Sequence, residues 1–322
     1  MAKIFVTRHI PGKAVEMLTA AGHEVSVSSL QRPLSQDELI SELSKNNYDG
    51  VLSLLTDKID ANVFNAAPSV KIFSNYAVGF NNFDLAEAKK RSVVISNTPG
   101  TSTNAVAEFT MTLILNAAKR IDEGDQLMRD GKFEGWNPEL LIGEEVKDKT
   151  LGLIGAGRIG SQVAYQAHRG FGMKIIYHDI VRNIALETEQ GAEYKATVEE
   201  VMKEADVVSL HTLLDETTHH LINKSHLELM KPTAILVNTS RGPVVDEVAL
   251  VEALKTKRIR GAAIDVYEFE PKMVEGLKEL SNVTLTPHIA SSTEEARNAM
   301  SVQAAENLIE FFAGGEPKFK VA

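Results

Sequence analysis

The strongest constraint on the fold is an alternation, along the whole chain, of short apolar strand-like runs with helix-like stretches. The stretches between the runs, such as 12–22 and 35–46, carry apolar residues at helical spacing. This pattern is typical of parallel sheets covered by helices. The first hundred residues therefore predict an α/β unit, with strands at 3–7, 24–28, 50–55, 71–77 and 93–97.

A second unit of the same kind is predicted further along the chain. It opens with one uninterrupted helical pattern over 102–132, whose Ala and Leu content suits a buried helix. Strand-like runs alternating with helices then match a doubly wound dinucleotide-binding domain. These strands are expected at 149–157, 173–179, 206–212, 234–240, 260–267 and 282–288.

The end of the chain indicates how the two units are connected. The last helical stretch, 293–313, is expected to pack back on the first unit, so the chain would cross between units near 98–103 and 286–292. The predicted fold class is therefore α/β, with two doubly wound parallel-sheet domains. A Rossmann cofactor domain is inserted into a flavodoxin-like substrate domain, the first covering 99–288 and the second 1–98 plus 289–322.

Composition narrows the classes of function and partner. The chain has 322 residues, 43% apolar and 24% charged, which favours a soluble globular protein of two domains. The net charge of −10 argues against nucleic acid and anionic membranes as partners. The absence of cysteine excludes disulfides, thiolate metal sites and cysteine nucleophiles. No signal-like or membrane-spanning run is found, so a cytoplasmic location is expected.

A glycine-rich segment, TLGLIGAGRIG, follows an apolar strand and precedes a helical stretch. It places Gly155, Gly157 and Gly160 in the G-x-G-x-x-G spacing of a dinucleotide-binding turn. In such a turn the glycines allow a tight bend, close approach of a pyrophosphate and close packing of helix on strand. The amides of Arg158 and Ile159 are expected to face the phosphates.

An acidic residue after the next strand indicates which cofactor is bound. Asp179 lies 19 residues after Gly160, where a carboxylate accepts hydrogen bonds from a ribose diol and repels a 2′-phosphate. NAD is therefore predicted, with NADP as the second choice because Arg182 lies close by. Further candidates for the cofactor site are Thr103, Thr212, Thr239 and Asp265; Asp265 could contact the nicotinamide amide or only end its strand.

Four charged or titratable residues of the second unit, a cation, two acids including Asp265 and a histidine, should meet at the edge where ligands bind. Reducing a 2-oxo acid needs a cation for the substrate and an acid for the developing alkoxide. Arg241 is the candidate cation and His288 the candidate acid, with Glu270 favouring the protonated imidazole. Individually, Arg241 could cap a turn and Glu270 could be a solvated loop acid.

The first unit offers a candidate site for the substrate carboxylate. The backbone amides of Val78 and Gly79 follow a strand and could hold one carboxylate oxygen. The surrounding stretch 72–83 contains no Lys or Arg, which favours a small, unphosphorylated substrate. No metal site is predicted, and His211, His219 and His220 are assigned to structure or surface because no partner or metal-ligand spacing is seen near them.

Taken together, GLIGAGRIG, VNTSRGPVVDEVALVEAL, GAAIDVYEFEP and LTPHIAS resemble the D-isomer-specific 2-hydroxyacid dehydrogenase family, over residues 50 to 310. The resemblance implies that Arg241 binds substrate, that Glu270 pairs with His288 and that His288 is the acid/base. It also implies a homodimer built largely by the cofactor domains.

Within the family, the chain looks most similar to glyoxylate and hydroxypyruvate reductases. Trp136 matches a tryptophan that in those enzymes reaches the partner's active site, and it could equally anchor an interface. The expected function is NADH-dependent reduction of glyoxylate or hydroxypyruvate to the D-2-hydroxy acid. The alternatives are a D-lactate-type or longer-chain dehydrogenase, or a non-catalytic, NAD-sensing binding protein of the corepressor kind.

Overall fold

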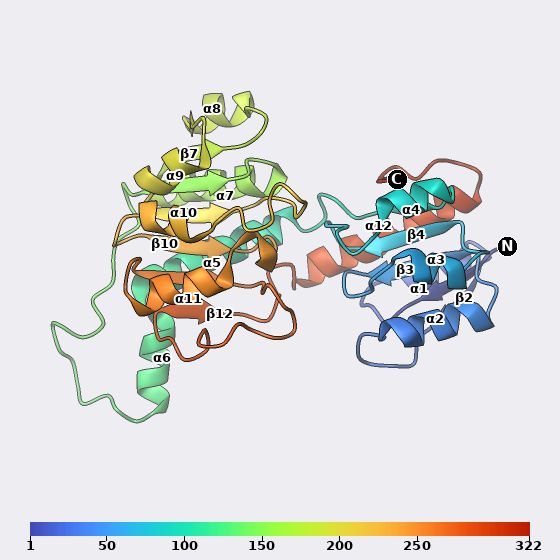
Figure 1. The fold of residues 1–322 in the computed structure, drawn as a ribbon, viewed down its shortest axis with the longest axis horizontal. Coiled ribbons are helices and arrows are strands. Elements are labelled where there is room, and N and C mark those ends of the chain that lie inside the picture. The colour runs from blue at the N-terminus through green and yellow to red at the C-terminus, as the bar shows by residue number, and fades with distance from the viewer. The chain divides into compact units, whose positions relative to one another are not determined.

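The structure, a computed structural model, describes all 322 residues and divides the chain into two compact units. Unit 1 consists of Met1–Ser102 and Ser292–Ala322, and unit 2 of Thr103–Ser291. The two crossings thus lie a few residues beyond the boundaries at 98/99 and 288/289 that the sequence predicts. Figure 1 shows that each unit is a sheet covered by helices.

Unit 1 contains a five-stranded, entirely parallel sheet in the order β2-β1-β3-β4-β5. This is the strand order of flavodoxin-like folds. All five predicted strands are present: β1 (Lys3–Val6), β2 (Glu24–Val27), β3 (Gly50–Leu54), β4 (Ile72–Tyr76) and β5 (Val94–Ser96). The helices are α1 (Ala14–Ala20), α2 (Gln36–Lys45), α3 (Ala61–Ala66), α4 (Leu85–Lys90) and α12 (Glu294–Phe312).

The C-terminal helix α12 belongs to unit 1, as the sequence predicts. Its Met300, Ala304 and Leu308 are buried in the same apolar cluster as Leu52 and Ile72 of the sheet. Long-range hydrogen bonds also join it to the rest of the unit, two of them near the sheet. Ser74 Oγ donates to the Ala304 carbonyl at 2.9 Å, and Asn307 Nδ2 donates to the Asn97 carbonyl at 3.0 Å.

Unit 2 contains a seven-stranded parallel sheet in the order β12-β11-β10-β9-β6-β7-β8. Counted within the unit this is the Rossmann order 3-2-1-4-5-6 with one further strand at the edge. The strands are β6 (Thr150–Ile154), β7 (Lys174–His178), β8 (Glu193–Tyr194), β9 (Val207–Leu210), β10 (Ile235–Asn238), β11 (Gly261–Ile264) and β12 (Val283–Leu285). The six predicted strands are present, and β8, only two residues long, is additional.

Alternate residues of these strands face two apolar clusters, because side chains of a strand point to opposite faces. The helices of unit 2 are α5 (Thr103–Lys119), α6 (Ile121–Arg129), α7 (Arg158–Phe171), α8 (Ile184–Gln190), α9 (Val198–Glu204), α10 (Lys224–Leu229), the 3-10 turn η1 (Gly242–Val244) and α11 (Glu247–Lys255). In β10, Leu236 packs into the cluster with α9, α10 and α11, whereas Ile235 and Val237 pack into the cluster with α5 and α7. Measured by length and hydropathy together, none of the helices qualifies as a membrane span.

The prediction of one uninterrupted helix over 102–132 is wrong. The helix breaks at Arg120, whose φ of 59° lies in the left-handed region, and continues as the separate helix α6. Arg120 is held by a bidentate ion pair with Glu123, with both hydrogen bonds at 2.7 Å. The helical spacing of apolar residues continues beyond Arg120 in the sequence because α6 is itself amphipathic. None of the residues of α6 is buried within the chain.

Candidate active site

The glycine turn after β6 is built by two close backbone approaches. Gly155 has a φ of +95°, and a Cβ atom there would lie 2.7 Å from the carbonyl oxygen of His211. A Cβ at Gly160 would collide with the carbonyl of Gly155. A Cβ at Gly157, in contrast, would meet nothing within 4 Å. Packing within the protein therefore explains why positions 155 and 160 need glycine. The space in front of Gly157 is open.

Helix α7 begins at this open space. Its N-cap is Gly157, and no side chain caps the amides of its first turn. Unpaired amides and the positive end of the helix dipole favour an anion at such a position. The turn therefore fits a pyrophosphate, which the amides of Arg158 and Ile159 would hold.

The end of β7 carries a carboxylate that is already fixed beside the glycine turn. Asp179 Oδ2 accepts a hydrogen bond from the Ala156 amide at 2.7 Å. The nearby Arg182 is occupied, because its Nε and Nη2 donate to both oxygens of Glu187 at 3.0 and 2.6 Å. Its guanidinium also lies over the ring of Tyr194, 5.2 Å from the centroid. This arrangement favours a ribose diol over a 2′-phosphate.

The loop after β9 adds an unsatisfied hydroxyl and a neutral imidazole. Thr212 Oγ1 is buried and has no hydrogen-bond partner, so a bound molecule would satisfy it. Burial lowers the pKa of His211 to about 3, and its Nε2 lies 2.9 Å from Ser209 Oγ. His211 is thus a neutral structural residue, as the sequence analysis assigned it. Thr239, after β10, pairs with Thr110 through their hydroxyls at 2.9 Å.

Three elements of unit 2 bring the proposed catalytic residues to one edge of the sheet. His288 follows β12, and its Nδ1 lies 3.0 Å from Glu270 Oε2 in the segment after β11. The other oxygen, Glu270 Oε1, accepts the Tyr267 amide at 3.0 Å. His288 Nε2 makes no hydrogen bond within the protein, which leaves that nitrogen for a substrate.

The electrostatics of this pair keep the carboxylate ionised. Burial alone would raise the pKa of Glu270. The hydrogen bond and charge of His288, the Tyr267 amide and the charge of Arg241 together outweigh burial and hold the pKa below its usual value. An ionised carboxylate at hydrogen-bond distance stabilises the protonated form of an imidazole.

Arg241 lies in the segment after β10, where the backbone is closely packed. A Cβ atom at the next residue, Gly242, would collide with the carbonyl of Tyr267, so this segment and the one after β11 meet backbone to backbone. Asn238 Nδ2 donates to the Arg241 carbonyl at 2.9 Å, and Arg241 Nη1 donates to the Ser240 carbonyl at 2.7 Å. Burial lowers the pKa of Arg241 and the charge of Glu270 opposes this, but a guanidinium remains charged at neutral pH.

Asp265 has a function that the sequence analysis missed. Its side chain is completely buried, with 0% exposure, and accepts hydrogen bonds from Thr286 Oγ1 at 2.6 Å and from the Ile289 and Ala290 amides at 2.9 and 2.8 Å. The His288 amide donates to the Asp265 carbonyl at 2.8 Å. Asp265 therefore holds the turn on which His288 adopts its φ of 55°.

Glu247 is a second residue that the sequence analysis missed. Its side chain is 1% exposed; Oε1 accepts the Glu268 amide at 2.7 Å, and Oε2 has no partner. Burial, assisted by the negative charges of Glu268 and Glu270, raises the pKa of Glu247 to about 7. Glu268 also pairs with His220, whose Nε2 lies 2.8 Å from Glu268 Oε1. The expectation that His220 has no partner is therefore wrong.

In unit 1, the loop after β4 presents the two amides that the sequence analysis selected. The carbonyls of Val78 and Gly79 accept hydrogen bonds from Asn97 Nδ2 at 2.7 Å and Asn75 Nδ2 at 2.9 Å. Neither amide donates a hydrogen bond within the protein. Thr103 lies at the start of α5, and its role in the cofactor site stays a prediction. Trp136 is 85% exposed, and its role at the partner's active site or at an interface also stays a prediction.

Comparison with known proteins identifies the family. The family model described as the NAD binding domain of D-isomer specific 2-hydroxyacid dehydrogenases matches residues 111–290. The chain belongs to this family. The resemblance stated from the motifs is thereby confirmed, and so are the two α/β domains and the assignment as an oxidoreductase with an NAD-binding domain.

Relatives match the chain over nearly its whole length. A glyoxylate reductase of Korarchaeum cryptofilum is 44% identical over 98% of this chain and 94% of its own. A solved structure of a Thermus thermophilus protein has a TM-score of 0.90 at 39% identity, covering 99% of this chain and 100% of its own. The solved structure of an NADPH-dependent glyoxylate/hydroxypyruvate reductase from Sinorhizobium meliloti has a TM-score of 0.87 at 31% identity. The match covers 100% of this chain and 98% of that one.

The first prediction concerns cofactor preference. Glu187→Gln keeps an acceptor for the Tyr177 hydroxyl, which donates to Glu187 at 2.6 Å, but removes the charge that holds Arg182. The released guanidinium can then pair with a 2′-phosphate, so kcat/KM for NADPH relative to NADH should rise about tenfold, or about 1.4 kcal/mol. Glu189→Gln on the same helix is the control. An unchanged ratio in Glu187→Gln would mean that Arg182 does not govern the preference.

The second prediction concerns stability and pH. A carboxyl group whose folded pKa is about 7, above its ordinary 4.5, stabilises the fold at low pH and loses this contribution as pH rises through 7. Glu247→Gln cannot ionise, so it should be more stable than the wild type by about 1–3 kcal/mol at pH 8.5, with the difference vanishing towards pH 4.5. Urea unfolding at both pH values measures this, with the exposed Glu252→Gln of the same helix as control. A pH-independent difference would contradict the raised pKa of Glu247.

Proposed function

We propose that the protein reduces glyoxylate or hydroxypyruvate to the D-2-hydroxy acid, with NADH as the preferred reductant. The observation that carries this proposal is the His288–Glu270 pair, 3.0 Å apart, on a unit that also holds Arg241 and the glycine turn. The glyoxylate reductase of Korarchaeum cryptofilum, 44% identical over 98% of this chain, supports the choice of substrate.

In this reaction Arg241, His288 and Glu270 have different tasks. When bound, the nicotinamide cofactor supplies a hydride to the carbonyl carbon of the 2-oxo acid. The guanidinium of Arg241 binds the substrate carboxylate and polarises the carbonyl. Protonated His288 donates the proton on Nε2 to the carbonyl oxygen as it becomes an alkoxide, and Glu270 holds the ring and stabilises its charge until that transfer. The C=O group thus gains one hydride and one proton.

The amides of Val78 and Gly79, in unit 1, are proposed to bind a carboxylate oxygen of the substrate. Their carbonyls are tied back by Asn97 and Asn75, which leaves the amides as donors. The stretch 72–83 contains no Lys or Arg, so it provides no charge for a phosphorylated substrate. This supports an unphosphorylated 2-oxo acid.

A homodimer is also proposed. Helix α6 and the segment after it expose an unusual number of large apolar side chains: Ile121, Met128, Phe133, Trp136, Leu140 and Ile142. Apolar patches of this kind mark protein–protein contacts. Trp136 would then be buried against the partner, at the interface or at its active site. The cytoplasmic location expected from the sequence stays a prediction.

The third prediction tests the acid. Steady-state reduction of glyoxylate, hydroxypyruvate, pyruvate and longer 2-oxo acids is measured with NADH and with NADPH. His288→Ala should lower kcat by about 100-fold or more, because it removes the group that is proposed to protonate the alkoxide. Glu270→Gln should also lower kcat, because the imidazolium loses its adjacent anion.

Other outcomes of the same assay decide between alternatives. A preference for pyruvate or longer acids would indicate a D-lactate-type or longer-chain dehydrogenase. NADH binding without turnover of any acid would indicate a non-catalytic, NAD-sensing protein instead. An unchanged rate in His288→Ala, with an unchanged melting temperature, would overturn the assignment of the acid.

The fourth prediction tests the homodimer. The wild-type chain should elute as a dimer, with a mass of twice 35.2 kDa, in size-exclusion chromatography with light scattering. Charging the patch in a Met128→Glu, Ile142→Glu variant should shift the mass to that of a monomer, because burying unpaired carboxylates is costly. Tyr165→Glu, at an exposed position outside the patch, is the control. A monomeric wild type would contradict the proposal.

A further inference from the structure

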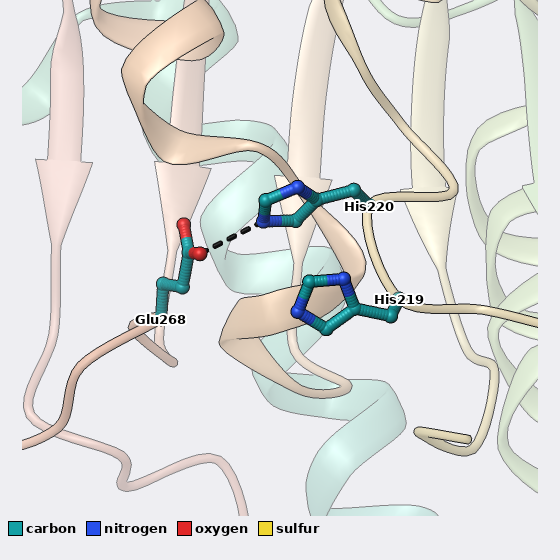
Figure 2. Close-up of side chains that lie close together, drawn as sticks. All are labelled: His219, His220 and Glu268. Atoms are coloured by element: carbon teal, nitrogen blue, oxygen red, sulfur yellow. Dashed lines mark hydrogen bonds and ion pairs between the residues drawn. The ribbon is translucent and has the colours of Figure 1, made fainter. Parts of the chain in front are cut away.

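Two loops of unit 2 bring two imidazoles and a carboxylate together away from the His288–Glu270 pair. His219 and His220 lie between β9 and α10, and Glu268 lies in the segment after β11. One ligand atom from each residue lies within 4.8 Å of the other two. Figure 2 shows the two rings and the carboxylate facing the same space. We propose that His219, His220 and Glu268 form a binding site for a divalent transition metal ion, with Zn²⁺ as the best match.

The fold holds these three residues in place by backbone contacts. The His219 amide donates to the Asp215 carbonyl at 3.0 Å, and the His220 amide donates to the Pro243 carbonyl at 2.8 Å. On the other loop, the Glu268 amide donates to Glu247 Oε1 at 2.7 Å. The backbone of the site is therefore fixed before any ion binds, and only side-chain rotations are needed.

The geometry is close to that of a three-ligand zinc site. Bonds of about 2.0–2.2 Å in a tetrahedral arrangement place neighbouring ligand atoms about 3.3 Å apart. His220 Nε2 and Glu268 Oε1 are 2.8 Å apart, so a modest separation admits the ion. The His219 ring is stacked on His220 with centroids 4.1 Å apart, is exposed and makes no hydrogen bond, so it is free to turn towards the ion. Water would complete the coordination.

Charge around Glu268 also favours a cation. The Glu268 side chain is only 10% exposed, and it forms an ion pair with His220. The carboxylate of Glu247 lies against the same backbone segment and adds no positive charge. Buried carboxylates are stable when paired with a cation or a metal. Two nitrogen ligands select Zn²⁺ and its neighbours in the transition series over Mg²⁺ and Ca²⁺, which prefer oxygen.

The site would link two loops that border the candidate active site. His219 and His220 share their loop with Thr212, and Glu268 lies two residues before Glu270. An ion bound to both loops would restrict their movement relative to each other. Metal binding depends only on His219, His220, Glu268 and the backbone contacts that hold them. It does not depend on which substrate the protein reduces.

The experiment is calorimetric titration of ZnCl2 into tag-free, chelator-treated protein. Wild type should bind one ion per chain, and its melting temperature should rise with ZnCl2, since a ligand of the folded state stabilises it. His219→Ala, His220→Ala and Glu268→Gln should each weaken binding about tenfold or more, the loss of about 1.4 kcal/mol. Co²⁺ should show the intense visible bands of a four-coordinate ion in wild type only.

The control is His226→Ala, which removes another His–Glu pair, with Nε2 3.5 Å from Glu199 Oε1 and no second imidazole. Its Zn²⁺ affinity should equal that of wild type. Because His219 is exposed, His219→Ala remains folded even if a change at Glu268 disturbs the core. No saturable binding in wild type, or binding that survives His219→Ala or Glu268→Gln in folded protein, would overturn the proposal and leave a His220–Glu268 ion pair.

Discussion

The buried carboxylate of Asp265 determines where the candidate acid stands. It accepts three hydrogen bonds from the turn after β12, and its backbone carbonyl accepts a fourth from His288 itself. A buried carboxylate with fewer hydrogen-bond donors would raise the free energy of the folded state. The carboxylate therefore holds the turn in place, and the turn stabilises the carboxylate. The position of His288, its distance from Glu270 and the direction of its second ring nitrogen all depend on this arrangement.

Close contact between backbones builds the rest of the edge. The glycine turn lies against the His211 carbonyl, and Gly242 lies against the Tyr267 carbonyl, at distances that exclude any side chain. These contacts bring the ends of separate strands together without intervening side chains. The charged groups then interact across short distances, which is why Glu270 is influenced by both His288 and Arg241.

The sequence predicted the parts of the structure that depend on local pattern. Eleven of the twelve strands and the insertion of one unit into the other follow from apolar periodicity, and the selection of Glu270, His288 and Arg241 follows from their position after strands. The sequence analysis did not predict β8, because a strand of two residues is too short to show an apolar pattern. It also did not predict the break at Arg120, because no Gly or Pro marks that position.

The sequence also missed interactions between residues far apart in the chain. Glu268 pairs with His220 across 48 positions, and Asp265 bonds to the Ala290 amide across 25. A single sequence carries no signal for such pairs, because each partner alone is an ordinary polar residue. The burial of Glu247, and hence its raised pKa, arises in the same way from tertiary packing.

The place of α12 has a consequence for how the chain folds during synthesis. Unit 1 completes its core with Met300, Ala304 and Leu308, and its edge strand β5 bonds to Val321, all of which follow unit 2 in the chain. A ribosome therefore releases every residue of unit 2 before unit 1 has its last helix. Until then one face of the N-terminal sheet is covered only in part, by α1, so unit 2 can reach its native fold before unit 1 is complete.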